Sequence, residues 1–167
     1  VPAERFRFSP FAFYHLSMGD EQDVMRGLSS FGAEIEELRG FMPRIQERGL
    51  LLIDELARGT NPFEGQAMTK AIVERLTTAP TISVLTTHFD GVLAPKTRHL
   101  QVRGLKAIES DAVEAADLES YMDYRLVEVT SDREVPKDAL KIARLMGFPQ
   151  DVLERAEEMM NDKRGGF

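Results

Sequence analysis

Residues 50–65, with the sequence LLLIDELARGTNPFEG, decide the fold of this chain. The four apolar residues 50–53 predict a short strand that is buried on both faces of a parallel sheet. Asp54 and Glu55 follow at the expected end of this strand, because an unpaired charge inside a buried strand is costly. In open α/β sheets the carboxyl ends of the strands are where ligands bind. The stretch therefore predicts a binding edge that carries an acidic pair.

A helix and a second strand are expected next. Asn61 is suited to the N-cap, Pro62 to the first helical position and Glu64 to a capping box. Residues 81–86, TISVLT, are rich in β-formers. Strand, helix and strand form a βαβ unit with parallel strands, which places the acidic pair and His88 at one sheet edge. The apolar residues expected on the buried face of this helix are Phe63, Ala67, Met68, Ala71, Ile72 and Leu76.

The remaining pattern completes an α/β fold, with a parallel-core sheet flanked by helices and further helices at the C-terminus. The other predicted strands are one or two within 6–16, one at 99–103 and one at 124–129. The other predicted helices are 30–46, 109–122, 137–146 and 149–160. Pro43 is expected to end or kink the helix in which it lies.

Composition sets broad limits on the class of protein. The chain has 167 residues and 43% hydrophobic residues, from which we expect a single domain over residues 1–167. It has no cysteine, which excludes disulfide chemistry and is consistent with a cytoplasmic location. We find no signal-peptide pattern and no apolar segment that spans a bilayer, and so expect no membrane partner. The net charge of −7 argues against a broad nucleic-acid footprint on these residues.

The acidic pair and a pair of serines suit nucleotide chemistry. An Asp that holds Mg²⁺ and a Glu that orients or deprotonates water match phosphoanhydride hydrolysis, whereas the alternative is a strand-end pair bonded to nearby helix N-termini. Ser29 and Ser30 precede a predicted helix, whose free amide groups favour phosphate. An ordinary serine N-cap explains the same residues. These residue types alone leave both alternatives open.

Three motifs in order resemble the MutS family of ATPases. Residues 54–60, followed by Glu64-Gly65, resemble its Walker B segment and the loop after it. Residues 27–31, GLSSF, together with Glu34, resemble its Gly-x-Ser-Thr-Phe-x-x-Glu signature loop. Residues 86–89, TTHF, resemble its Thr-His-Tyr switch histidine. The similarity extends over most of the chain, including Val-Pro-Ala at the start and the closing helices, and is weakest at 105–137.

The resemblance implies ATP and Mg²⁺ as cofactors. Asp54 would be the metal ligand and Glu55 the catalytic carboxylate. His88 would contact the γ-phosphate or the attacking water. In the family the signature loop, here with Ser29 and Ser30, meets the γ-phosphate bound to the opposite subunit. A further set of nucleotide-binding residues would line the same dimer seam, namely Arg58, Gly59, Thr60 and Asn61. The implied partner is a second copy, or a paired MutS-like subunit, on the ATPase face.

The Walker A motif Gly-x-x-x-x-Gly-Lys-Ser/Thr is absent from these 167 residues. In the family it lies one helix upstream of Val-Pro-Ala, so we expect a piece of a longer protein that is the distal part of a P-loop (ABC-type) ATPase domain. Residues 1–167 alone are expected to be inactive.

Three functions remain open for the whole protein. The default is a DNA mismatch-repair MutS, which would bind DNA only through other parts. The sequence differs from the family pattern at Asp138-Ala139, where Tyr-Gly is usual, and at Phe89-Asp90-Gly91. These departures favour divergent members that remodel or reactivate a partner enzyme of the aminomutase type. A catalytically inactive interaction module is the third alternative.

Overall fold

The structure, a computed structural model, describes residues 2–17, 30–106, 118–131 and 138–164. The chain divides into two compact units, Val1–Thr97 and Arg98–Phe167, and each is described by itself. The single domain expected over the whole chain stays a prediction.

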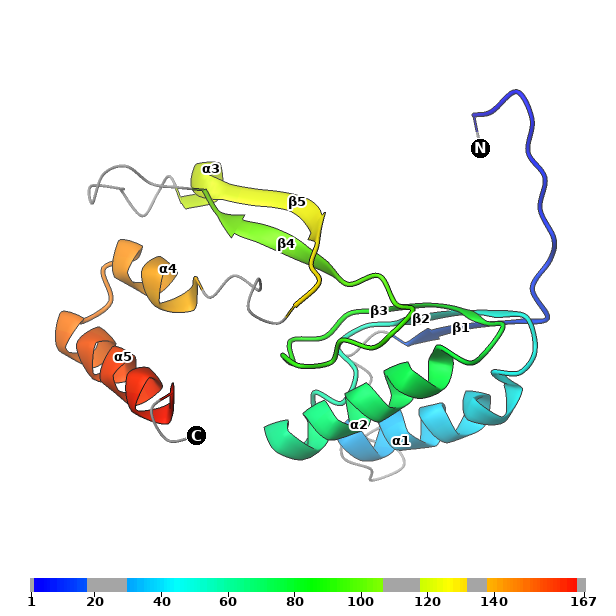
Figure 1. Cartoon of the computed structure of the whole chain (residues 1–167), viewed down its shortest axis with the longest axis horizontal. Helices are drawn as coiled ribbons and strands as arrows, with labels where there is room; N and C mark the ends of the chain where they lie inside the picture. Colours follow the sequence, from blue (N-terminus) through cyan, green and yellow to red (C-terminus); the bar gives the residue numbers. More distant parts are fainter. Residues whose placement is uncertain (1, 18–29, 107–117, 132–137, 165–167) are drawn as a thin grey trace. The chain divides into compact units, whose positions relative to one another are not determined.

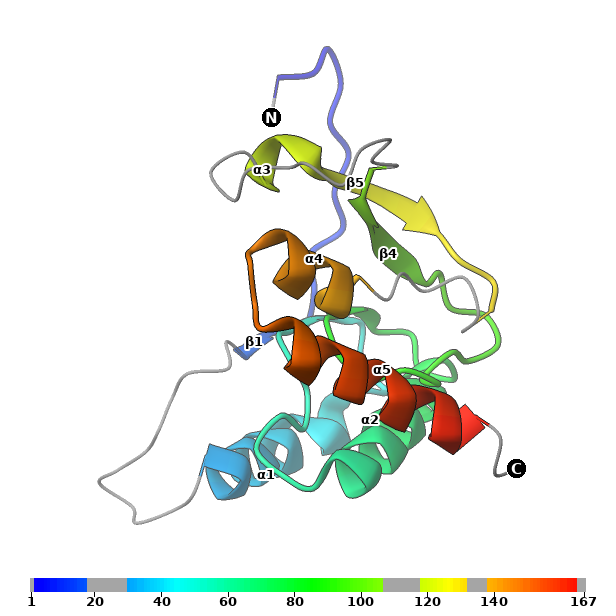
Figure 2. The same cartoon turned by 90° about the vertical axis from the view of Figure 1, so that its left-hand side faces the viewer.

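The first unit is built on a three-stranded parallel sheet in the order β1-β2-β3. The strands are β1 (Phe13–Ser17), β2 (Gly49–Ile53) and β3 (Ile82–Leu85). The helices α1 (Ser30–Phe41) and α2 (Pro62–Leu76) lie on the same side of this sheet in both ribbon views (Figures 1 and 2). The run β2-α2-β3 confirms the predicted βαβ unit and its parallel pair. The sheet therefore presents the carboxyl ends of all three strands along one edge.

Helix α1 is shorter than expected. It ends at Phe41, and a 3₁₀ turn, η2, follows at Met42–Arg44. The helix does not reach residue 46 as an α-helix, and the expectation that Pro43 ends or kinks it is confirmed, because Pro43 cannot donate the amide hydrogen bond that would continue the helix.

Helix α2 begins as expected and buries part of the expected face, since Ile72 and Leu76 are buried and Met68 packs against the core. Pro62 is its first residue, and the Asn61 side chain accepts a hydrogen bond of 2.9 Å from the Phe63 amide. Phe63, expected in the core, is 80% exposed. The residues buried along α2 are Gly65, Thr69, Ile72 and Leu76. The prediction is thus confirmed for Ile72 and Leu76 and wrong for Phe63, while Gly65 and Thr69 are buried although they were not expected to be.

The core lies between the sheet and the two helices. It joins residues of β1 and β2 with residues of α1 and α2, namely Phe13, Leu38, Phe41, Ile45, Leu51, Ile53, Leu56, Ala57, Ile72 and Leu76. The prediction that β2 is buried on both faces was wrong, since Leu51 and Ile53 are buried but Leu52 is 37% exposed. Helices α1 and α2 both cover the same face of the sheet. Alternate residues of each strand, such as Leu52, therefore lie on the opposite face.

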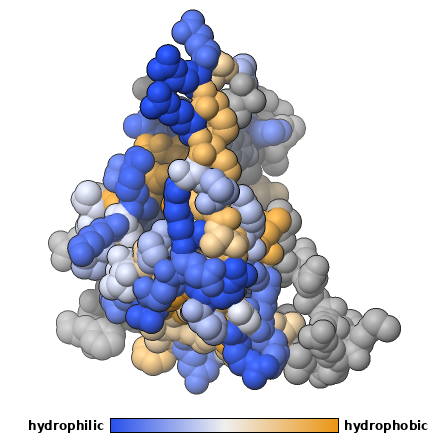
Figure 3. Space-filling view, turned by 90° about the vertical axis from the view of Figure 1, so that its right-hand side faces the viewer, coloured by the Kyte–Doolittle hydropathy of each residue, from blue (hydrophilic) through white to orange (hydrophobic). Residues whose placement is uncertain are grey.

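An extended aromatic stretch precedes β1. Phe6 and Phe8 stack with ring centroids 6.0 Å apart, and Phe8 meets Phe11 edge to face at 5.7 Å. Strand β1 starts only at Phe13, so the expected strand at 6–16 is confirmed in its last part alone. Phe6 is 64% exposed and Phe8 is 55% exposed. Figure 3 looks onto this side of the molecule, where hydrophobic and hydrophilic residues lie next to one another.

The second unit contains an antiparallel pair and two helices. The pair is β4 (Leu100–Leu105) and β5 (Met122–Glu128), with an irregularity between Val102 and Gly104. The short helix α3 (Leu118–Tyr121) precedes β5. Residues 107–117 of the predicted helix 109–122 lie outside the described residues, and Met122 belongs to β5. Helices α4 (Ala139–Leu145) and α5 (Gln150–Arg164) match the two predicted closing helices.

Candidate functional site

The acidic pair lies where the parallel register places it. The pairing of Ile53 with Leu85 puts Asp54 opposite Thr86, one residue beyond each strand. The Thr86 hydroxyl donates to Asp54 Oδ1 at 2.5 Å and accepts from the Glu55 amide at 2.9 Å. One threonine thus orients both acidic residues at the sheet edge.

The backbone of residues 54–58, which we call the acidic turn, is unusual. Glu55 has φ 51° and Ala57 has φ 63°, in the left-handed region that residues other than glycine seldom adopt. Leu56 and Ala57 are buried, with 0% and 1% exposed. The conformation turns the chain away from the sheet directly after the strand. It leaves Asp54 exposed at the edge and Glu55 partly exposed.

Side chains from both helices hold the acidic turn. Glu34 on α1 accepts the Ala57 amide hydrogen at 2.5 Å through Oε1. Thr69 on α2 donates to the Leu56 carbonyl oxygen at 3.3 Å. With Thr86 from the end of β3, three elements far apart in the sequence therefore fix the backbone that carries the acidic pair.

Glu34 is an ionisable residue that is partly buried. Burial raises the pKa of its carboxyl; the Ala57 amide lowers this pKa and the neighbouring carboxylate of Glu37 raises it further. Glu37, one turn along, accepts a hydrogen bond of 2.7 Å from the Ser17 hydroxyl and lies 3.1 Å from His15 Nε2. Helix α1 is therefore bonded both to the end of β1 and to the acidic turn.

Glu55 is paired within its own turn. Its Oε2 lies 2.5 Å from Arg58 Nη1, with side chains that are 38% and 54% exposed. An exposed pair of this kind contributes about 0–1 kcal/mol. It is weak enough that a competing ligand can displace Arg58 from the carboxylate.

Asp54 and its neighbours fit a magnesium ion that is bound mainly by phosphate and water. Mg²⁺ in nucleotide sites keeps several waters and takes one or two carboxylates besides the phosphates. The edge offers the Asp54 carboxylate and the Thr86 hydroxyl. In the part of the chain that the structure describes, no group of three or more His, Cys, Asp or Glu residues is placed to hold a metal.

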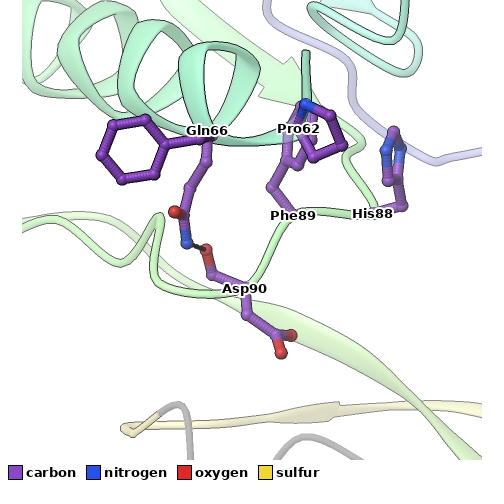
Figure 4. Close-up of a pocket in the computed structure, with 6 residues that line it drawn as sticks. Pro62, Gln66, His88, Phe89 and Asp90 are labelled. Atoms are coloured by element: carbon purple, nitrogen blue, oxygen red, sulfur yellow. Dashed lines mark hydrogen bonds between the residues drawn. The ribbon is translucent and has the colours of Figure 1, made fainter. Parts of the chain in front are cut away.

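His88 lies beyond β3 beside an open hollow. The hollow has a volume of about 370 Å³, and α2 and the loop after β3 line it through Pro62, Phe63, Gln66, His88, Phe89 and Asp90. Figure 4 shows His88 and Phe89 on that loop, with Gln66 bonded to the backbone oxygen of Asp90. Among the residues described, no hydrogen bond or ion pair joins His88 to the acidic pair. The two share a sheet edge without direct contact.

The other expected nucleotide-binding residues lie at the start of α1 or in the loop before α2, except for one that the structure does not describe. Ser29 lies outside the described residues, and Ser30 is the first residue of α1. Arg58, Gly59, Thr60 and Asn61 form the loop from the acidic turn to α2, which Asn61 caps. Asp54, Glu55 and this loop all lie in the connection between the end of β2 and the start of α2.

The sequence interpretation missed three residues that shape the site. Thr86 and Glu34 stand inside quoted motifs but were not expected to act, and Thr69 was not singled out. A signal existed for Thr86, because in-register parallel strands place the residues after their ends side by side. The motif that contains Glu34 assigned no role to it, and no local pattern pointed to Thr69.

No helix among the described residues is both long and apolar enough to cross a membrane.

Comparisons with known proteins all match this chain to MutS and MutS2 proteins. The family model described as MutS domain V matches residues 1–163. An endonuclease MutS2 of Thermomicrobium roseum is 32% identical over 152 residues, 91% of this chain and 18% of that protein. An endonuclease MutS2 of Thermus thermophilus is 35% identical over 147 residues, 87% of this chain and 18% of that protein. A DNA mismatch repair protein MutS of a Synechococcus strain is 29% identical over 171 residues, 99% of this chain and 18% of that protein. The chain spans about a fifth of the length of these relatives.

Proposed function

This chain belongs to the MutS domain V family, and from that premise we propose that it forms part of an ATP-binding and ATP-hydrolysing domain. In the whole protein this domain would act as a dimeric, ATP-driven conformational switch in DNA repair. The observation that carries the proposal is the acidic pair, which Thr86 orients at the carboxyl edge of a parallel sheet.

Each carboxylate has a role that its position supports. Asp54 is exposed beyond β2 and would hold Mg²⁺. An Mg²⁺ ion held there would supply positive charge to offset the negative charge that develops on the phosphate. Glu55 would accept the proton of the attacking water, or orient that water, once Arg58 is displaced from its carboxylate. His88, beyond the end of the neighbouring strand, would contact the γ-phosphate or the same water.

The remaining residues would act at a dimer seam. Ser30 is the first residue of α1, and with Ser29, which precedes it in the sequence, it would contact a phosphate bound to the opposite subunit, because the first amides of a helix lack partners within it. Arg58, Gly59, Thr60 and Asn61 would line the same seam. The partner is a second copy or a paired MutS-like subunit.

Replacing Glu55 tests the proposed chemistry. Glu55→Gln in the full-length gene product should lower ATP turnover roughly 10²–10⁴-fold, the usual value of a positioned base. Binding of ATP should persist, since glutamine keeps the size and removes only the charge. Glu74→Gln is a matched control on the exposed surface of α2. Turnover near that of the wild type in Glu55→Gln would rule out this assignment.

Mixing two inactive subunits tests the seam. Ser30→Arg would disable the site contributed in trans, and Glu55→Gln would disable the site in cis. A mixture of the two variants should regain about one working site per heterodimer, measured as steady-state phosphate release. If the mixture stays inactive although heterodimers form, Ser30 does not act across the seam.

DNA repair is the cellular role that the relatives' names support. One is named a DNA mismatch repair protein and others are named endonucleases. The second candidate is an ATPase that remodels a partner enzyme, which the departures from the family pattern at Asp138-Ala139 and Phe89-Asp90-Gly91 favour. Binding of the full-length gene product to duplexes with and without a mismatch separates them. A repair protein retains DNA at about 0.15 M salt, whereas a remodeller does not.

A further inference from the structure

The acidic turn depends on partners outside itself. Three polar backbone groups of the turn are each bonded to a different side chain. The Glu55 amide donates to Thr86, the Leu56 carbonyl accepts from Thr69, and the Ala57 amide donates to Glu34. The first partner is a strand-end hydroxyl and the second is a helix hydroxyl. Only the third is a carboxylate.

We propose that Glu34 is a positioning residue, which holds the acidic turn in the conformation that presents Glu55 at the sheet edge. The inference rests on the proposed function, in which Glu55 acts on the attacking water. Glu34 would not touch ATP or water itself. It would act through the Ala57 amide, which it binds at 2.5 Å.

Burial makes this hydrogen bond important for the turn. Ala57 is 1% exposed, so its amide has little access to replacement water. A buried amide without a partner is costly, and the backbone relieves the cost by changing conformation. Ala57 and Glu55 both have left-handed φ values, which nothing in their own side chains favours. Loss of the Glu34 acceptor would therefore let the turn relax and move Glu55.

The position of Glu34 also connects two parts of the proposed site. It lies one turn after Ser30, at the start of the helix that carries the expected γ-phosphate contact. Glu37 fixes the next turn of the helix to Ser17 at the end of β1. A shift of the start of α1 would carry the Glu34 carboxylate away from Ala57. The placement of Glu55 would therefore depend on the placement of α1.

Amide hydrogen exchange tests the contact directly. Residues 1–167 would be labelled with ¹⁵N, and exchange would be followed at the Ala57 amide by NMR. Glu34→Ala should speed exchange there about tenfold or more, the equivalent of one hydrogen bond. Glu34→Gln, which keeps an acceptor oxygen of the same reach, should restore most of the protection. Glu36→Ala is the control, because Glu36 pairs with Arg39 on the exposed side of the same helix.

Kinetics of the full-length gene product test the consequence. Glu34→Ala should lower kcat roughly 10–10²-fold, as small misplacements of a reacting group do, with the KM for ATP within about twofold. Glu34→Gln should recover most of kcat, and Glu36→Ala should match the wild type. A purely structural role predicts no such split between kcat and KM and no rescue by glutamine.

Three results would overturn the proposal. The first is unchanged exchange at Ala57 in Glu34→Ala. The second is faster exchange at Ala57 with unchanged kcat. The third is a loss of kcat that glutamine does not recover although exchange at Ala57 is restored. Failure of the proposed function is recognised separately, because Glu55→Gln would then also leave turnover unchanged.

Discussion

Adding one methyl group at Gly65 should destabilise the protein by an amount that the structure allows us to work out. A Cβ at Gly65 would lie 2.6 Å from Cζ of Phe89 and 3.0 Å from the carbonyl oxygen of Ala57. The Phe89 ring can rotate away, but the carbonyl belongs to the acidic turn and must shift with it. Forcing an extra methyl into a packed site costs about 1–3 kcal/mol. The gain in helix propensity from alanine offsets about 0.5–1 kcal/mol.

The expected net loss for Gly65→Ala is about 0–2.5 kcal/mol in the free energy of unfolding, with a midpoint of about 1 kcal/mol. Gly40→Ala is the matched control, since Gly40 lies in helix α1 and a Cβ there meets nothing within 4 Å. Only the propensity term applies at Gly40, so this variant should gain about 0.5 kcal/mol. The same glycine-to-alanine change is thus expected to lower the free energy of unfolding at Gly65 and to raise it at Gly40.

Urea denaturation followed by far-UV circular dichroism measures both variants. Gly65→Ala should lower the midpoint and Gly40→Ala should raise it, with the same slope as the wild type. In thermal unfolding each kcal/mol corresponds to roughly 2–4 °C. Equal stability of Gly65→Ala and Gly40→Ala would refute the reasoning, because it would mean that α2 does not approach the acidic turn as closely as described.

Three further predictions concern the same unit. Asn61→Ala should cost about 0.5–2 kcal/mol in urea denaturation, since it removes the cap on the Phe63 amide, whereas Asn61→Asp should keep it. Burial raises the pKa of Glu34, so its stabilising contribution is complete below the ordinary glutamate pKa and is lost as pH rises through the raised value. Glu34→Gln should flatten that decline in unfolding free energy, and an unchanged pH profile would contradict it. Residues 1–167 alone, without a Walker A motif, should give no micromolar Mg-ATP binding by calorimetry.

The sequence by itself determined the elements whose causes are local. The apolar run 50–53 predicted β2, because a short run of apolar residues before an acidic pair is typical of a strand in a parallel sheet. Asn61 and Pro62 predicted the start of α2, because a cap and a fixed φ act on adjacent residues. The parallel pairing of β2 with β3 then followed from the helical crossover between them, whereas their register was not predicted. These local causes were enough to place Asp54 and Glu55 at the carboxyl edge of the sheet.

Other features were decided only by how the elements pack. Apolar spacing predicted the burial of Ile72 and Leu76 on α2, but only packing showed that Gly65 and Thr69 face the acidic turn. The partner of the Ala57 amide lies 23 residues away in Glu34, and the partner of the Glu55 amide lies 31 residues away in Thr86. Left-handed φ values at two residues that are not glycine have no local cause. Tertiary hydrogen bonds supply that cause, so only the folded structure shows how the acidic pair is held.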